Sequence, residues 1–88
     1  MSKPNEQGEA ADHIKQLLVK AGYFISPRKI TLEDNQHWFV FEYKERQVGI
    51  DSASGIWVRE SSDDAWRCIA MPCTVSGALQ AVETLIGN

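Results

Sequence analysis

A chain of 88 residues is long enough for one hydrophobic core, and 43% apolar with 24% charged residues is the composition of a folded globular protein rather than a disordered one. The formal net charge is -3, and the nine Lys and Arg residues are scattered, which disfavours binding to nucleic-acid phosphates or anionic lipid. The polar N-terminus lacks the apolar segment of a secretory signal, and no apolar run approaches the roughly 18 residues of a membrane-spanning helix. We therefore expect a cytoplasmic protein without a membrane partner.

The N-terminal segment, residues 1–8, contains Pro4 and Gly8 and no apolar residue after the initiator Met. We expect a flexible tail there, followed by one α+β domain over residues 9–88. A helix is predicted over residues 9–21, because apolar residues recur at helical spacing and Gly22 follows where a left-handed cap belongs. These apolar residues are Ala10, Ile14, Leu17, Leu18 and Ala21.

The middle of the chain changes to an alternation of apolar and polar residues with a period of two, which is typical of strands. A short strand is predicted over residues 30–32, and the turn signal at Asp34 and Asn35 leads into the strongest predicted strand, residues 37–43. Three further runs, residues 47–51, 56–60 and 66–71, are separated by polar turns. Strands joined by short turns predict an antiparallel meander of four or five strands.

The C-terminal segment returns to helical spacing. Pro72 ends the last strand, Thr74 or Ser76 can cap a helix, and Gly87 can end it. The stripe predicted to face the core contains Val75, Ala78, Leu79, Val82, Leu85 and Ile86. Two amphipathic helices that flank one antiparallel sheet predict a two-layer α+β sandwich with both helices on one face of the sheet.

Large apolar side chains occur at both parities of residues 37–43, so both faces of that strand are apolar. Two helices are wide enough to cover one face of such a sheet and cannot cover both. The face assigned to the helices carries Phe39, Phe41, Tyr43, Val48 and Ile50. The open face, our candidate interaction surface, carries Trp38, Val40 and Trp57, with Arg59 and Trp66 as further members. A register slip of one residue would exchange the two faces.

The reactive residue types show no arrangement that is typical of a catalytic or metal site. Four residues separate Cys68 from Cys73, and the two histidines, His13 and His37, fall in different predicted elements. We therefore predict no catalytic residue, no metal ligand and no cofactor. Both thiols should be free, and Cys73 is interpreted as a packing residue, with a redox role as the alternative because a helix N-terminus that could lower its pKa follows.

An open aromatic face favours a role in binding, because Trp and Arg are enriched at the centres of protein interfaces. We predict a small interaction or accessory module that docks on a protein partner or on a second copy of itself. One alternative is that the aromatic face stacks the bases of single-stranded nucleic acid, which the interleaved acidic residues disfavour. A further alternative is a small enzyme with an unrecognised site, and in the plainest interpretation the tryptophans only complete the core of a thin domain.

Overall fold

The computed structural model describes residues 6–87, and its elements follow the predicted order. Helix α1 spans Glu6–Lys20 and helix α2 spans Val75–Ile86, with five strands between them. The strands are β1 (Arg28–Thr31), β2 (His37–Tyr43), β3 (Arg46–Ile50), β4 (Ile56–Arg59) and β5 (Arg67–Ala70). They form one open antiparallel sheet in the order β1-β2-β3-β4-β5, so the predicted α+β fold and meander are confirmed.

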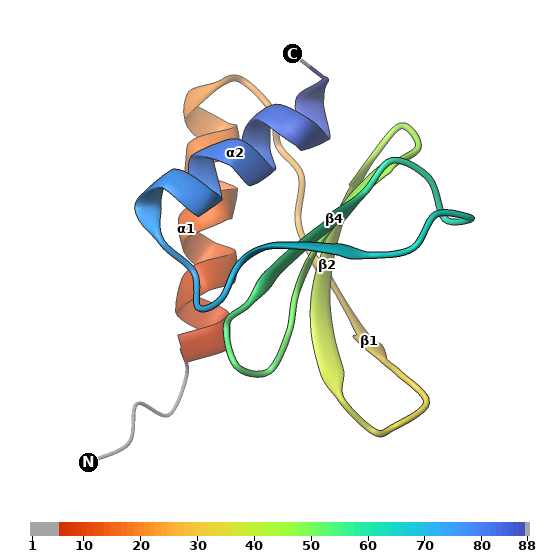
Figure 1. The fold of residues 1–88 in the computed structure, drawn as a ribbon. Coiled ribbons are helices and arrows are strands. Elements are labelled where there is room, and N and C mark those ends of the chain that lie inside the picture. Colours follow the sequence, from red (N-terminus) through yellow and green to blue (C-terminus); the bar gives the residue numbers. More distant parts are fainter. Residues whose placement is uncertain (1–5, 88) are drawn as a thin grey trace.

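Both helices lie on one side of the sheet and enclose the main core against it (Figure 1). Ile14 and Leu18 of α1 and Leu85 of α2 contribute fully buried side chains to this core. The fully buried strand residues are Phe41, Val48, Ile50, Ile56 and Val58. Phe39 and Tyr43 pack partly against the same core, so the face that the sequence assigns to the helices is confirmed.

Helix α1 begins at Glu6, three residues before the predicted start, so residues 6–8 are helical rather than part of a tail. The Gln7 side chain supplies a physical reason. Its amide nitrogen donates to the backbone carbonyls of His37, at 2.6 Å, and of Ile50, at 3.1 Å, and so ties the first turn to β2 and β3. An apolar pattern does not reveal such a polar anchor. The rest of the predicted tail, residues 1–5, lies outside the described residues.

The buried side of α2 differs from the predicted stripe, because small residues make the closest approach to the sheet. A Cβ on Gly77 would lie only 2.6 Å from the Cβ of Ala70, so the helix meets β5 at a position without a side chain. The buried residues of α2 are Gly77, Ala78, Ala81, Val82 and Leu85. Val75 is 68% exposed and Leu79 46% exposed, so the prediction that these two residues belong to the core is wrong.

Candidate functional site

The structure brings the five predicted interaction residues together on the sheet face that points away from the helices. The register pairs Val40 of β2 with Gly49 of β3, and Gly49 with Trp57 of β4, so these positions lie side by side. Trp66 precedes β5 in the chain, and its ring packs against Trp38, with 5.3 Å between the ring centroids. We call Trp38, Trp57 and Trp66 the tryptophan cluster.

Gly49 lies directly beneath the tryptophan cluster and has no side chain to displace its rings. A Cβ at this position would lie 2.7 Å from Cε3 of Trp38 and 3.3 Å from Cη2 of Trp66, so both rings rest on bare backbone of β3. The centroids of Trp38 and Trp57 are 5.7 Å apart, which together with the Trp38–Trp66 spacing falls in the range of favourable aromatic pairs. Trp38 therefore contacts both other rings.

Arg59 holds the loop between β4 and β5 against the sheet. Its guanidinium carbon lies 4.2 Å from the centroid of the Trp66 ring, a cation–π contact. Its Nε donates to Oε1 of buried Gln47 at 2.5 Å, and its Nη1 donates to the backbone carbonyls of Ser62 and Asp64 at 3.2 and 3.4 Å. These bonds fix the guanidinium, and with it the position of Trp66.

Asp51 performs the corresponding role for Trp57. Its Oδ2 accepts a hydrogen bond from the indole Nε1 of Trp57 at 2.8 Å. Its Oδ1 accepts from the backbone N–H groups of Ala53 and Gly55, each at 2.8 Å, and so closes the turn between β3 and β4. The carboxylate is buried and has three donors, which makes it a structural acceptor that positions the ring.

The candidate surface divides into a buried base and a partly exposed rim. Trp38 is 6% exposed and Val40 is 2% exposed, so both are covered within a single copy of the chain. Trp57, Trp66 and Arg59 keep intermediate exposure. A partner can therefore contact these three residues directly, while Trp38 and Val40 support them from below. The sequence pattern gives the face of a strand residue but not its exposure, so this division was missed.

Charges of both signs accompany the rim. On the same face, Arg28 of β1 and Glu42 of β2 form an ion pair with 3.2 Å between Nη2 and Oε1. The loop that Arg59 holds contains three exposed acidic residues beside Trp66, namely Glu60, Asp63 and Asp64. The rim is therefore neither a basic track for a phosphate backbone nor a purely apolar patch.

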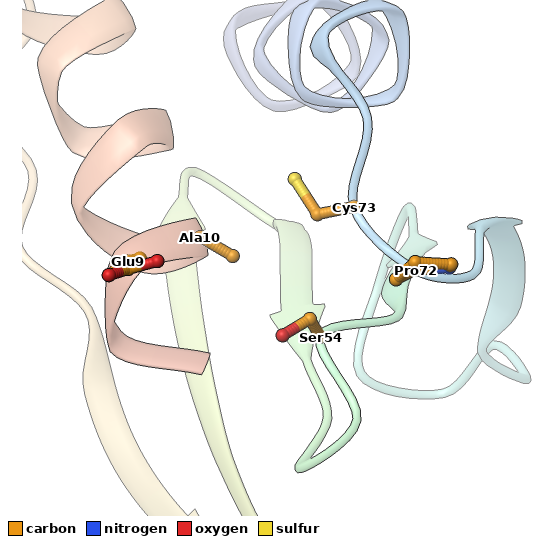
Figure 2. A pocket seen from close by; sticks show the side chains of 5 residues that line it. All are labelled: Glu9, Ala10, Ser54, Pro72 and Cys73. Carbon is orange, nitrogen blue, oxygen red and sulfur yellow. The ribbon is translucent and has the colours of Figure 1, made fainter. Parts of the chain in front are cut away.

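A second candidate site is a cavity of about 310 Å³ where α1, the turn between β3 and β4, and the connection from β5 to α2 meet (Figure 2). Its lining residues are Glu9, Ala10, Ser54, Pro72 and Cys73. Ser54 is 5% exposed, and among residues 6–87 its Oγ is the one buried side-chain oxygen without a hydrogen-bond partner. Figure 2 shows this oxygen pointing from the turn toward α1.

Cys73 lines this cavity as a neutral thiol. Burial raises the pKa of the Cys73 thiol, so the protonated form persists at neutral pH. The adjacent helix does not offset this effect, because Thr74 caps α2, with its Oγ1 accepting from the backbone N–H of Gly77 at 3.0 Å. The structure thus favours the packing interpretation of Cys73 over the redox alternative.

Cys68 should accordingly be alkylated faster than Cys73 at neutral pH, because Cys68 is exposed and the thiolate is the reacting form. Iodoacetamide labelling followed by peptide mass spectrometry measures both rates in the same sample, and Cys68→Ser isolates the slower reaction. Equal rates at the two thiols, or faster labelling of Cys73, would contradict the protected state assigned to Cys73.

Known proteins offer no guide to either candidate site. Comparisons of the chain with protein-family models, with curated proteins and with solved structures found no match. Among residues 6–87, no group of three or more His, Cys, Asp or Glu side chains is placed to hold a metal ion, and no helix is long and apolar enough to cross a membrane. The function must therefore be inferred from the chain's own residues.

Proposed function

We propose that the protein is a small interaction module that associates with a second copy of itself through the sheet face bearing the tryptophan cluster. The observation that supports this most strongly is that Trp57, Trp66 and Arg59 are held in position while remaining partly exposed. Trp and Arg are the residue types that dominate binding energy at protein interfaces. The two free thiols accord with the expected cytoplasmic location.

The fixed positions of these side chains reduce the entropic cost of association. Ordering a flexible side chain at an interface costs about 0.5–1.5 kcal/mol of binding free energy. Here the Asp51 carboxylate already holds the Trp57 indole, and Gln47 and the loop carbonyls already hold Arg59. The folded chain therefore presents three contact residues whose ordering cost is largely met before binding.

The distribution of charge favours a second copy as the occupant. With a net charge of -3, two copies repel each other at long range. The proposed face carries both signs, because Arg59 lies next to the acidic loop of Glu60, Asp63 and Asp64. In a two-fold dimer the same patch meets itself, so the acidic loop of one copy can face the basic side chains of the other.

The size of the face sets the expected strength of the dimer. Five strands of four to seven residues give a projected area of about 350 Å² at the usual strand spacing and rise. A face of this extent with three partly exposed contact residues is typical of the small surfaces that transient complexes bury, so we expect a weak, reversible dimer.

Single-stranded nucleic acid fits this face less well. The guanidinium of Arg59 lies over one face of the Trp66 ring, and Trp38 is buried, so fewer ring faces are free to stack on bases. The acidic loop lies beside them and would repel phosphates. Nucleic acid therefore remains a less favoured alternative, to be measured alongside self-association.

Sedimentation equilibrium should show a monomer–dimer equilibrium with a dissociation constant of about 0.05–1 mM. Trp57→Ser should weaken the dimer at least about tenfold, because an aromatic residue at the centre of an interface is commonly a hot spot. Phe24→Ser is the matched control, since Phe24 is 84% exposed and lies in the connection between α1 and β1, outside the proposed face.

Circular dichroism of the same variants checks that both remain folded. A parent chain that stays monomeric at about 2 mM, above the upper end of the expected range of dissociation constants, would overturn self-association. A dimer that Phe24→Ser weakens and Trp57→Ser leaves intact would place the interface elsewhere. Tight binding of a single-stranded oligonucleotide, lost in Trp57→Ser, would favour the nucleic-acid alternative instead.

A further inference from the structure

We propose that the cavity between α1, the turn after β3 and the connection to α2 binds an ammonium group carried on a short alkyl chain. Within residues 6–87 the buried Ser54 hydroxyl has no hydrogen-bond partner, and Glu9, an exposed residue of α1, also lines the cavity. The rest of the lining is apolar or neutral. This inference does not depend on the proposed function, because the cavity shares no lining residue with the tryptophan cluster.

The Ser54 hydroxyl is the first part of the argument. Buried polar groups in proteins are nearly always hydrogen-bonded, so an unpaired one requires an explanation. The turn is closed by other bonds, from the Ser54 N–H to the Asp51 carbonyl at 3.0 Å and from Ala53 and Gly55 to the Asp51 carboxylate, and none of them uses the Ser54 hydroxyl. The hydroxyl is therefore available to a molecule in the cavity.

The backbone at Ser54 strengthens this point. Its φ is 68°, in the left-handed region that glycine or asparagine adopts more readily than serine. A glycine would close the same turn without this cost. What serine adds at this position is the hydroxyl, which points toward α1 and the Glu9 side of the cavity (Figure 2).

The remaining lining residues indicate the chemistry of the ligand. The Glu9 carboxylate attracts a cation, and an ammonium group has enough N–H donors for both Glu9 and the Ser54 Oγ. Ala10, Pro72 and the Cys73 thiol provide an apolar wall for a short hydrocarbon chain. The cavity volume of about 310 Å³ is at the low end for ligand pockets, so a small ligand and millimolar affinity are expected.

Two competing ligands follow from the same geometry. Glu9 and Cys73 lie near the first turns of the two helices, and helix N-termini favour anions. A small carboxylate, which has the opposite charge, is therefore the first competing ligand. An uncharged alcohol with the same alkyl chain is the second competing ligand, because it has the same shape and can form a hydrogen bond with Ser54 without Glu9.

Amide NMR spectra of the full chain, titrated with n-butylammonium, n-butyrate and n-butanol, separate these cases. We expect saturable shifts of the amide signals of Ala10, Ser54 and Cys73 with n-butylammonium, and none with the other two probes. Ser54→Ala and Glu9→Gln should each weaken binding at least about fivefold, because each removes one of two polar contacts. Glu83→Gln, which changes an exposed carboxylate on α2 outside the cavity, should leave binding unchanged.

The free amine and a lysine side chain of another protein share this chemistry, and a fourth probe distinguishes them. Equal binding of Nα-acetyl-lysine methylamide indicates that the cavity accepts a lysine side chain, whereas binding of n-butylammonium alone indicates a free amine. Ser54→Gly repeats the test if Ser54→Ala alters the turn. Saturable shifts with n-butyrate only, equal shifts with n-butanol, or no shifts with any probe would overturn the proposal.

Discussion

Trp38→Ala is expected to lower the free energy of unfolding by about 3–5 kcal/mol, the usual cost of truncating a buried aromatic residue. Trp38 is 6% exposed, lies over Gly49 and contacts the rings of Trp57 and Trp66. Its removal leaves a space beneath two rings whose positions depend on it. Urea unfolding followed by circular dichroism measures the loss without relying on tryptophan fluorescence, which the substitution itself changes.

Trp57→Ala provides the comparison for this experiment. Trp57 is partly exposed, so its truncation should cost less folding stability than that of Trp38 and should act mainly on association. A loss below about 1 kcal/mol for Trp38→Ala would show that the sheet face opposite the helices contributes little to stability, contrary to the observed burial of Trp38.

Leu85→Ala should cost about 2–5 kcal/mol of unfolding free energy, whereas Leu79→Ala should cost less than about 1 kcal/mol. The two residues lie on the same helix and undergo the same change, so helix propensity cancels in the comparison. Leu85 is fully buried in the main core, and Leu79 is 46% exposed. Thermal or urea unfolding of the pair measures the difference. Equal losses of unfolding free energy would show that Leu79 contributes to the core, as the helical spacing predicts.

The order of elements and the assignment of faces could be predicted because both depend on local periodicity. The period of two in residues 37–43 places Phe41 and Trp38 on opposite faces whatever their surroundings, and the spacing in residues 75–86 requires a helix. Of the two predicted N-cap residues, Thr74 rather than Ser76 caps α2, and Gly87 ends the helix as predicted. These features are encoded within a few residues of where they appear.

The features that could not be predicted depend on contacts between distant segments. Gln7 starts α1 early through bonds to His37 and Ile50, and the lack of a side chain on Gly77 lets α2 lie close to Ala70. The exposure of the residues on the candidate surface could not be predicted for the same reason. Its five residues do gather on one face, but the burial of Trp38 depends on a loop that Arg59 folds back over the sheet.

The indole N–H signals of the three tryptophans, followed by NMR as the protein is concentrated, test the proposed interface most directly. Self-association through this face predicts that the signals of Trp57 and Trp66 shift between about 0.02 and 2 mM along a single dimerisation curve. The Trp38 signal should shift least, because Trp38 is 6% exposed whereas Trp57 and Trp66 are partly exposed. Trp57 and Trp66 signals that stay constant while other surface amides shift, or no shift anywhere over this range, would contradict an interface on this face.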